Sequence, residues 1–250
     1  MIAFPALLAI LAVTPVTSPR PADPGTGADV IRLMQARGAK GWYQAVTFVQ
    51  RTTQADGSVA TWYEALRIPG MLRIDIAPVS SGNVMLFRND SIYRYLNGEL
   101  KLSRPLVHPL LLLGFDVYAQ PAERTTAALR QLGYDMTKVH AATWQGRKVW
   151  VVGAAEGDTA SKQFWVDQER LVFVRDLGPH PQKEGVLTEV QFNKYVALGK
   201  GWIETEVLFL ENGAVTLTEE YTQLAADPAA ALDPALYEPG PYRAPGWVTE

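Results

Sequence analysis

The segment from Ser161 to Leu177 constrains the fold of this chain more than any other. Its sequence, SKQFWVDQERLVFVRDL, holds two β-branched and aromatic runs, Gln163–Val166 and Leu171–Val174, on either side of a polar turn. This pattern predicts an antiparallel hairpin. The first arm carries apolar residues on both of its period-2 faces, whereas a sheet with one wetted face would alternate cleanly. The segment therefore predicts a sheet that other parts of the chain cover.

Most of the chain repeats this form, so we predict about a dozen strands. Gly- and Asn-containing turns separate the apolar runs, and Asn97-Gly98 and Asn212-Gly213 are strong hairpin signals. Neighbours in sequence should be neighbours in the sheet. The expected strands are 42–53, 58–67, 71–77, 83–87, 92–96, 99–102, 142–144, 148–153, 163–166, 171–174, 187–196, 202–210 and 214–221.

Helical patterns occur in only a few places. Thr26 to Gly38 predicts a short helix with a polar N-terminus, an apolar face and a terminating glycine. Leu106 to Gln120 is apolar without period 2, and Pro121 to Leu132 predicts a helix that begins with proline and ends before Gly133. We expect these segments to cover the sheet.

The chain of 250 residues predicts one folded domain over 28–224. Residues 1–22 are predicted to be a secretory signal peptide, since an apolar run opens the chain; a hydrophobic N-terminal strand is the alternative. A linker at 23–27 precedes the domain, and a Pro/Ala-rich tail at 225–250 follows it, with docking points at Leu232, Leu236, Tyr237 and Tyr242. We therefore expect an exported protein of the periplasm with no transmembrane segment in the mature chain.

Neither composition nor motifs indicate an enzyme. The net charge of −3 argues against nucleic acid as a partner, and the absence of cysteine excludes thiolate chemistry. Three separate histidines, His108, His140 and His180, are interpreted as solvated loop residues rather than metal ligands. Two carboxylate pairs, Glu204/Glu206 and Glu219/Glu220, are interpreted as solvated strand edges. We predict no catalytic residue, no metal and no cofactor.

The remaining candidate for a functional site is the apolar face of the predicted sheet. A curved sheet under few, short helices has more apolar face than those helices can fill, and unfilled apolar concavity makes ligand pockets. The alternative is a closed, dry core made of the same residues. The predicted cavity residues are Phe48, Trp62, Leu66, Ile68, Leu72, Ile74, Leu86, Tyr93, Tyr95, Phe164, Val166 and Phe192; the predicted lid residues are Leu110, Leu111, Leu112, Leu113, Phe115 and Leu129.

Several segments resemble the outer-membrane lipoprotein-sorting family, which includes the LolA and LolB proteins. They are Phe48–Arg51, the turn Asp56-Gly57, Arg67–Asp75, Trp144–Gly153 and Phe164–Asp167. The likeness spans roughly 28 to 221. The resemblance implies an unclosed antiparallel β-barrel of about eleven strands, with helices forming a lid on its concave face over a cavity for acyl chains.

The resemblance also implies a role for the Pro69 to Ile74 segment. In the family's lipoprotein carrier, an Arg before the proline and a Phe three residues after it control lid closure. Here Ile68 precedes Pro69, Leu72 stands in place of the Phe, and Arg67 lies one position early, hence on the opposite face.

Three functions stay open from the sequence. The first is a periplasmic carrier that holds acyl chains of a lipid or lipoprotein for transfer to the outer membrane, with a membrane-bound donor or receptor as a further partner. The second is an envelope sensor or protein-interaction module like RseB, which uses the same sheet without a cavity. The third, an enzyme, would need an acid/base pair in the pocket.

Overall fold

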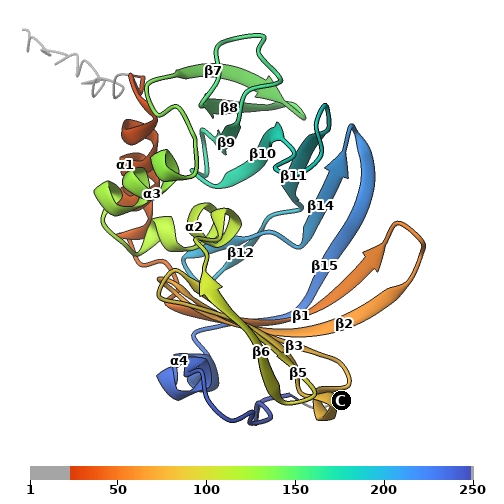
Figure 1. Cartoon of the computed structure of the whole chain (residues 1–250). Coiled ribbons are helices and arrows are strands. Elements are labelled where there is room, and N and C mark those ends of the chain that lie inside the picture. Colours follow the sequence, from red (N-terminus) through yellow and green to blue (C-terminus); the bar gives the residue numbers. More distant parts are fainter. Residues whose placement is uncertain (1–22, 249–250) are drawn as a thin grey trace, which may run out of the picture.

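A single antiparallel sheet of thirteen strands dominates the computed structural model, which describes residues 23–248 (Figure 1). The sheet curves without closing, as predicted, and has two strands more than eleven. The predicted signal peptide at 1–22 lies outside the described residues. The strands are β1 (Ala45–Gln54), β2 (Val59–Arg67), β3 (Met71–Ile76), β4 (Asn83–Arg88), β5 (Ser91–Leu96), β6 (Glu99–Pro105), β7 (Val139–Trp144), β8 (Arg147–Val152), β9 (Gln163–Asp167), β10 (Phe173–Pro179), β11 (Leu187–Asn193), β14 (Glu206–Glu211) and β15 (Ala214–Ala226).

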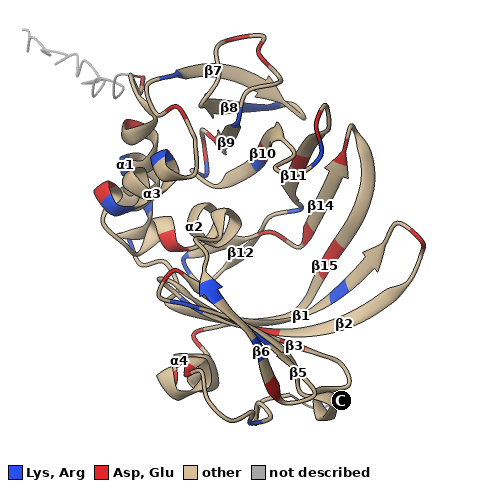
Figure 2. Ribbon diagram, viewed as in Figure 1, with Lys and Arg blue, Asp and Glu red and all other residues tan. Residues whose placement is uncertain are grey.

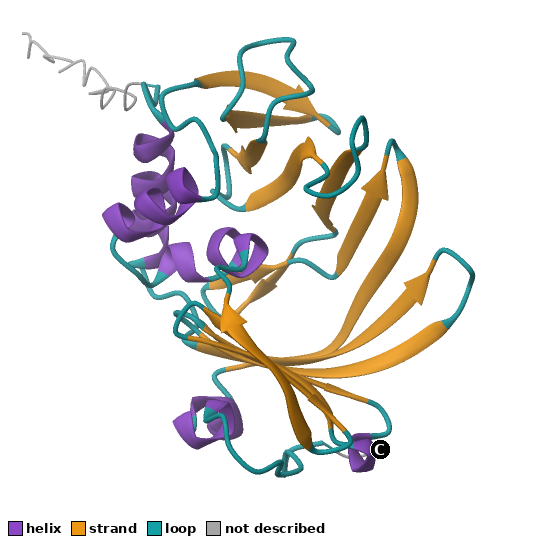
Figure 3. Cartoon of the chain, viewed as in Figure 1, coloured by secondary structure: helices purple, strands orange, loops and turns teal. Residues whose placement is uncertain are grey.

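The strand order explains where the cover lies. The order is β6-β5-β4-β3-β2-β1-β15-β14-β11-β10-β9-β8-β7, so sequence neighbours pair, and β15 joins the two halves by pairing with β1. The two edge strands, β6 and β7, are consecutive in the chain. The segment between them contains α2 (Pro109–Gly114), the 3₁₀ turn η2 (Asp116–Tyr118) and α3 (Ala122–Gln131). This segment therefore crosses the open side of the sheet (Figure 3).

Two of the predicted strands are each interrupted. The run 187–196 divides into β11 and β12 (Val196–Leu198), and the run 202–210 divides into β13 (Gly201–Ile203) and β14. β12 and β13 pair with each other as a separate two-stranded sheet. Lys194, with φ of 52°, lies at the first break. Hydropathy alone does not reveal such a break, because both runs stay apolar on either side of it.

The helix α1 (Gly27–Gly38) begins where the sequence predicts. Thr26 and Asp29 form a reciprocal capping box, in which the Thr26 side chain accepts from the Asp29 N–H and the Asp29 carboxylate accepts from the Thr26 N–H. Gly38 lies against the backbone of Tyr118, where a Cβ would approach the carbonyl oxygen to 2.1 Å. A glycine at this position lets α1 contact η2 closely.

Helices α1 and α3 cover the β7–β10 half of the sheet with a filled core. The ring of Tyr134 contacts Phe164 edge-on at a centroid distance of 5.4 Å, and its hydroxyl donates to Asp176. Lys162 Nζ donates to the Leu132 carbonyl at 2.7 Å, which ties the end of α3 to the sheet. This half of the sheet therefore has a packed core. Its fully buried side chains include Val30, Ile31, Met34, Leu129, Val152, Phe164 and Val166.

The segment after β15 lies on the convex face, away from α1, α2 and α3 (Figure 3). It forms α4 (Ala229–Leu232) and the turn η3 (Pro234–Tyr237), and the ring of Tyr237 is fully buried against β1, β2 and β4. Beneath it, Arg73 and Asp75 form a buried ion pair at 2.7 Å. The carbonyl of Arg243 accepts a further hydrogen bond from Arg73 at 2.6 Å. The tail is thus an integral layer of the fold.

Candidate functional site

A mainly apolar cavity of about 190 Å³ lies between the concave face of the first half of the sheet and α2. Its floor follows the pairing of the strands: Val46, Leu66, Leu72 and Phe87 form one row across β1 to β4. The next row contains Phe48, Glu64, Ile74 and Met85. The lining residues are Phe48, Gln50, Trp62, Glu64, Leu66, Leu72, Ile74, Met85, Phe87, His108, Leu110, Leu111, Phe115, Phe192, Phe209, Glu219 and Tyr221.

The predicted site residues fall into three groups. Half of them line this cavity. A second group is buried in the core but does not line it. The lining members are Phe48, Trp62, Leu66, Leu72, Ile74, Phe192, Leu110, Leu111 and Phe115; the core members are Ile68, Phe164, Val166, Leu112, Leu113 and Leu129.

The third group, Leu86, Tyr93 and Tyr95, lies on the convex face, so the prediction that they share a face with Leu72 is wrong. Leu86 pairs with Tyr93 and packs under the C-terminal tail, and Tyr95 accepts a hydrogen bond from Gly240. Leu86, Tyr93 and Tyr95 share one face of the sheet with one another. That face is opposite to the one that carries Leu72 of β3, because Leu72 pairs with Phe87 and not with Leu86. A one-residue slip exchanges the faces of a strand. The missed concave residues on β4 are Met85 and Phe87.

Two carboxyl groups lie in this apolar surface. Glu64 on β2 is 5% exposed and Glu219 on β15 is 9% exposed. Glu219 accepts a hydrogen bond from the Tyr221 hydroxyl at 2.8 Å. Acidic residues are visible on β15, the central strand of the sheet (Figure 2). The sequence held the signal for Glu64, because it alternates with Trp62 and Leu66, both of which were predicted to face the cavity.

Burial changes the protonation of these groups. Desolvation raises the pKa of Glu219 to about 7, and desolvation with the nearby charges of Glu219 and Glu204 raises the pKa of Glu64 well above its usual value. Desolvation also raises the pKa of Glu204, which is 1% exposed, to about 8. The interpretation of Glu204 and Glu219 as solvated edges is therefore wrong. Glu219 points inward because strand alternation on β15 places it on the opposite face from Glu220, whereas Glu204 lies in the break between β13 and β14.

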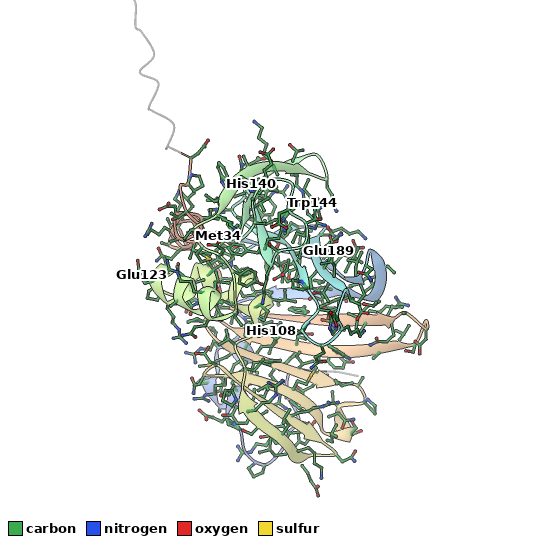
Figure 4. The ribbon with its side chains drawn as sticks, turned by 45° about the horizontal axis from the view of Figure 1, so that its top comes forward. Met34, His108, Glu123, His140, Trp144 and Glu189 are labelled. Atoms are coloured by element: carbon green, nitrogen blue, oxygen red, sulfur yellow. The ribbon has the colours of Figure 1, made fainter. Side chains whose placement is uncertain are left out.

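His108 lines the cavity and is half-buried, so it is not the fully solvated loop residue that was predicted (Figure 4). Its Nδ1 accepts from the Leu111 N–H at 3.2 Å and so caps α2. Its ring meets Phe87 edge-on at a centroid distance of 5.0 Å. Burial lowers the pKa of His108 to about 4, so the imidazole is neutral at neutral pH.

A second, more polar cavity of about 210 Å³ adjoins the first. Phe87, His108 and Leu111 line both cavities, so these three side chains form the partition between them. The polar cavity includes Arg88 and Arg124 among its lining residues. A movement of α2, which carries Leu111, would join the two spaces.

One polar contact ties the lid to the sheet. The Asp116 carboxylate, in η2, accepts from the Gly70 N–H at 2.7 Å. Gly70 follows Pro69 in the turn between β2 and β3. Desolvation raises the pKa of Asp116 to about 7. We call the Asp116–Gly70 hydrogen bond the lid contact.

The polar side chains in the cavity lining are few. Among the described residues that line it there is no serine, threonine, lysine or cysteine, and the ionisable groups are Glu64, His108, Glu219 and Tyr221. Within 23–248, no group of three His, Asp or Glu side chains is arranged to hold a metal ion. No helix in the same range is long and apolar enough to cross a membrane. What the site offers is apolar area with a few buried polar groups, as small-molecule pockets do.

Comparison with known structures shows the fold. An outer membrane lipoprotein-sorting protein domain from Vibrio parahaemolyticus is 14% identical in sequence to this chain. Its TM-score is 0.53, and the match covers 80% of this chain and 92% of that one. A DUF1329 family protein from Desulfovibrio piger is also 14% identical, with a TM-score of 0.52 over 85% of this chain and 98% of that one. No protein-family model and no curated protein sequence matches the chain. The chain therefore has the fold of lipoprotein-sorting domains.

Proposed function

We propose that this chain is a non-enzymatic periplasmic carrier that holds the apolar part of a lipid or lipoprotein in the cavity beneath α2. The observation that carries the proposal is the cavity itself. It lies on the concave face of a sheet whose other half is filled by α1 and α3, and most of its lining is apolar. The lipoprotein-sorting fold supports the same use of this face.

The volume of the cavity limits the length of acyl chain that it can hold without a movement of the protein. Pockets for drug-sized ligands measure about 300–1,000 Å³, so a cavity of about 190 Å³ is too small for a long acyl chain. A longer chain would have to displace α2. That helix has six residues, too few to be stable without tertiary contacts. In this proposal α2 is the moving part of the lid, while α1 and α3 stay fixed.

The energetics allow a carrier that releases its cargo. Burying an acyl chain gains about 0.8 kcal/mol per methylene, so a long chain gains on the order of 10 kcal/mol. Displacing α2 and ordering the chain reduce that gain. Transfer from one membrane to another requires affinity that the acceptor can overcome.

Native mass spectrometry of the mature protein purified from an envelope fraction, followed by organic extraction, tests the proposal. We expect a bound lipid or acylated peptide that leaves on extraction. A mass that corresponds to protein alone, together with no uptake of a fluorescent fatty-acyl probe, would contradict it. The same preparation reports whether the cargo is a free lipid or a lipoprotein.

A second candidate, a protein-interaction module, is favoured by the edge strand β6. Every residue of β6 is exposed, including Leu100 and Leu102, and the strand pairs only with β5 within the described residues. An exposed edge can accept a strand from another protein. Charge substitution at Leu100 would abolish capture of such a partner and leave lipid binding unchanged.

A further inference from the structure

The carboxyl group of Glu64 has no partner inside the protein. It is 5% exposed and lines the cavity. Among the described residues, none donates a hydrogen bond to it or forms an ion pair with it; its electrostatic neighbours are the carboxyls of Glu219 and Glu204. Buried polar groups in proteins are nearly always hydrogen-bonded, because leaving one unpaired costs free energy. Because Glu64 lines the cavity, its carboxyl can form hydrogen bonds with a group from outside the chain, either water or a ligand.

Apart from one histidine, the ionisable side chains with shifted pKa values in the cavity are acidic, and a bound cation would favour their ionised form. Glu64 and Glu219 contribute two carboxyls, and none of the described residues that line the cavity is a lysine or an arginine. The single basic residue in the lining is His108, which burial keeps neutral and whose Nδ1 caps α2. The cavity therefore favours a cation and disfavours an anion.

The rest of the lining defines the other part of the ligand. Glu64 lies between Phe48 and Ile74 in its row, and Trp62 and Leu66 flank it along β2 on the same face. Leu110 covers this surface from α2. A ligand that satisfies both kinds of surface has a cationic, hydrogen-donating end and an apolar body.

We propose that the cavity binds amphiphiles with a primary ammonium group, whose head meets Glu64 and Glu219 and whose chain lies against Leu72, Ile74 and Leu110. The proposal rests on the carrier function proposed above and adds the chemical class of the head group. An ammonium carries three donors, enough for both carboxylates at once. A buried cation is tolerated only when it is paired, and these carboxyls supply the pair.

Ligands with other head groups would interact differently with the two carboxyls. A fatty acid would bring a third carboxyl into a lining that has no lysine or arginine among the described residues, so its negative charge would have no cationic partner. A neutral alcohol donates one hydrogen bond and gains nothing from the second carboxyl. Affinity for single-chain ligands of equal length should therefore fall in the order amine, alcohol, carboxylate.

Isothermal titration of the purified protein with dodecylamine, dodecanol and dodecanoate tests this order, with the ionic ligands below their micelle concentrations and dodecanol below its solubility limit. We expect dodecylamine to bind at least about tenfold more tightly than dodecanol, which corresponds to about 1.4 kcal/mol. Dodecanoate should bind most weakly. Equal affinities for the amine and the alcohol would overturn the proposal.

Two substitutions assign the preference to the cavity. Glu64→Gln should lower dodecylamine affinity about tenfold while dodecanol affinity stays within about twofold. Glu220→Gln removes an exposed carboxylate on the outer side of β15, where it pairs with Arg51, and should change neither. An equal loss in both variants would mean that the amine binds surface charge, which overturns the proposal.

The same titrations separate this proposal from the carrier function. If dodecanol binds and Leu110→Trp, which fills the cavity, abolishes its binding, the carrier function stands whatever the amine does. If none of the three probes binds to the unmodified protein, both proposals are overturned. Circular dichroism of each variant establishes that it is folded.

Discussion

At the scale of single residues, the site differs from a plain apolar pocket by its buried carboxyls. Glu64 and Glu219 line the cavity, and Glu204 lies buried close enough for its charge to raise the pKa of Glu64. One oxygen of Glu204, Oε1, has no hydrogen-bond partner among the described residues. Such groups stay in a fold at a cost in stability, and that cost depends on pH.

The pH dependence of stability has a definite sign at Glu204. Its pKa is raised from 4.5 to about 8 in the folded state, so between these values the folded protein binds more protons than the unfolded chain. Stability therefore falls as pH rises through this window, by up to about 1.4 kcal/mol per pH unit for each such carboxyl. Glu204→Gln removes the contribution of Glu204 to this pH dependence of stability.

Urea unfolding at about pH 5 and about pH 8 measures the effect. We expect wild type and Glu204→Gln to differ little at the lower pH and the variant to be the more stable at the higher pH. Glu220→Gln, at an exposed position, is the control. Equal pH dependence of wild type and Glu204→Gln would contradict the assignment.

At the scale of elements, the two halves of the sheet have different covers. Helices α1 and α3 are fixed over β7 to β10 by core packing and by the Lys162 and Tyr134 hydrogen bonds. Helix α2 lies over the cavity and is followed by η2, whose Asp116 makes the lid contact with Gly70. In the proposed carrier, α2 is therefore the part of the cover that moves, while α1 and α3 stay in place.

Asp116→Ala tests the lid contact. Without its acceptor, the Gly70 N–H loses this hydrogen bond, which costs about 1–3 kcal/mol of local stability. We expect faster uptake of a fluorescent fatty-acyl probe in stopped-flow measurements. Glu123→Ala, which removes an exposed carboxylate at the start of α3 (Figure 4), is the matched control. A lower melting temperature with an unchanged uptake rate would show that the contact supports the fold without controlling the lid.

The convex layer formed by the C-terminal tail should matter for stability and not for binding. Tyr237 is fully buried and its hydroxyl donates to the Ala231 carbonyl at 3.0 Å. Removing a buried aromatic side chain costs about 3–5 kcal/mol, so Tyr237→Ala should unfold at lower urea. Leu100→Ala, at a residue 50% exposed on β6, should change the midpoint little. Equal midpoints for the two variants would contradict the role given to this layer.

At the scale of the whole molecule, the sequence predicts the architecture better than the site. Alternating apolar runs and Asn-Gly turns predict most strands, and each pairs with its sequence neighbour. The pairing of β1 with β15 joins distant segments and leaves no local signal. The prediction placed the wrong residues of β4 on the concave face, because the turn η1 (Val79–Ser81), between β3 and β4, breaks the alternation of faces.

The filled and hollow halves of the sheet could not be told apart from the sequence. Phe164 and Phe48 have the same local pattern, yet α1 and α3 cover the first and the cavity adjoins the second. Which helix covers which strands depends on the three-dimensional path of the chain. Glu64, by contrast, was predictable, since its strand neighbours on the same face were already assigned to the cavity.

The affinity of a fluorescent fatty-acyl probe for Leu110→Trp and for Leu100→Trp tests whether an acyl chain occupies the cavity beneath α2. The first substitution enlarges a lining residue on α2, and the second places the same side chain on the exposed edge strand. We predict that Leu110→Trp lowers probe affinity by at least about tenfold, while Leu100→Trp matches wild type. Equal affinities in all three proteins would mean that the probe does not occupy this cavity, and the carrier proposal would then be wrong.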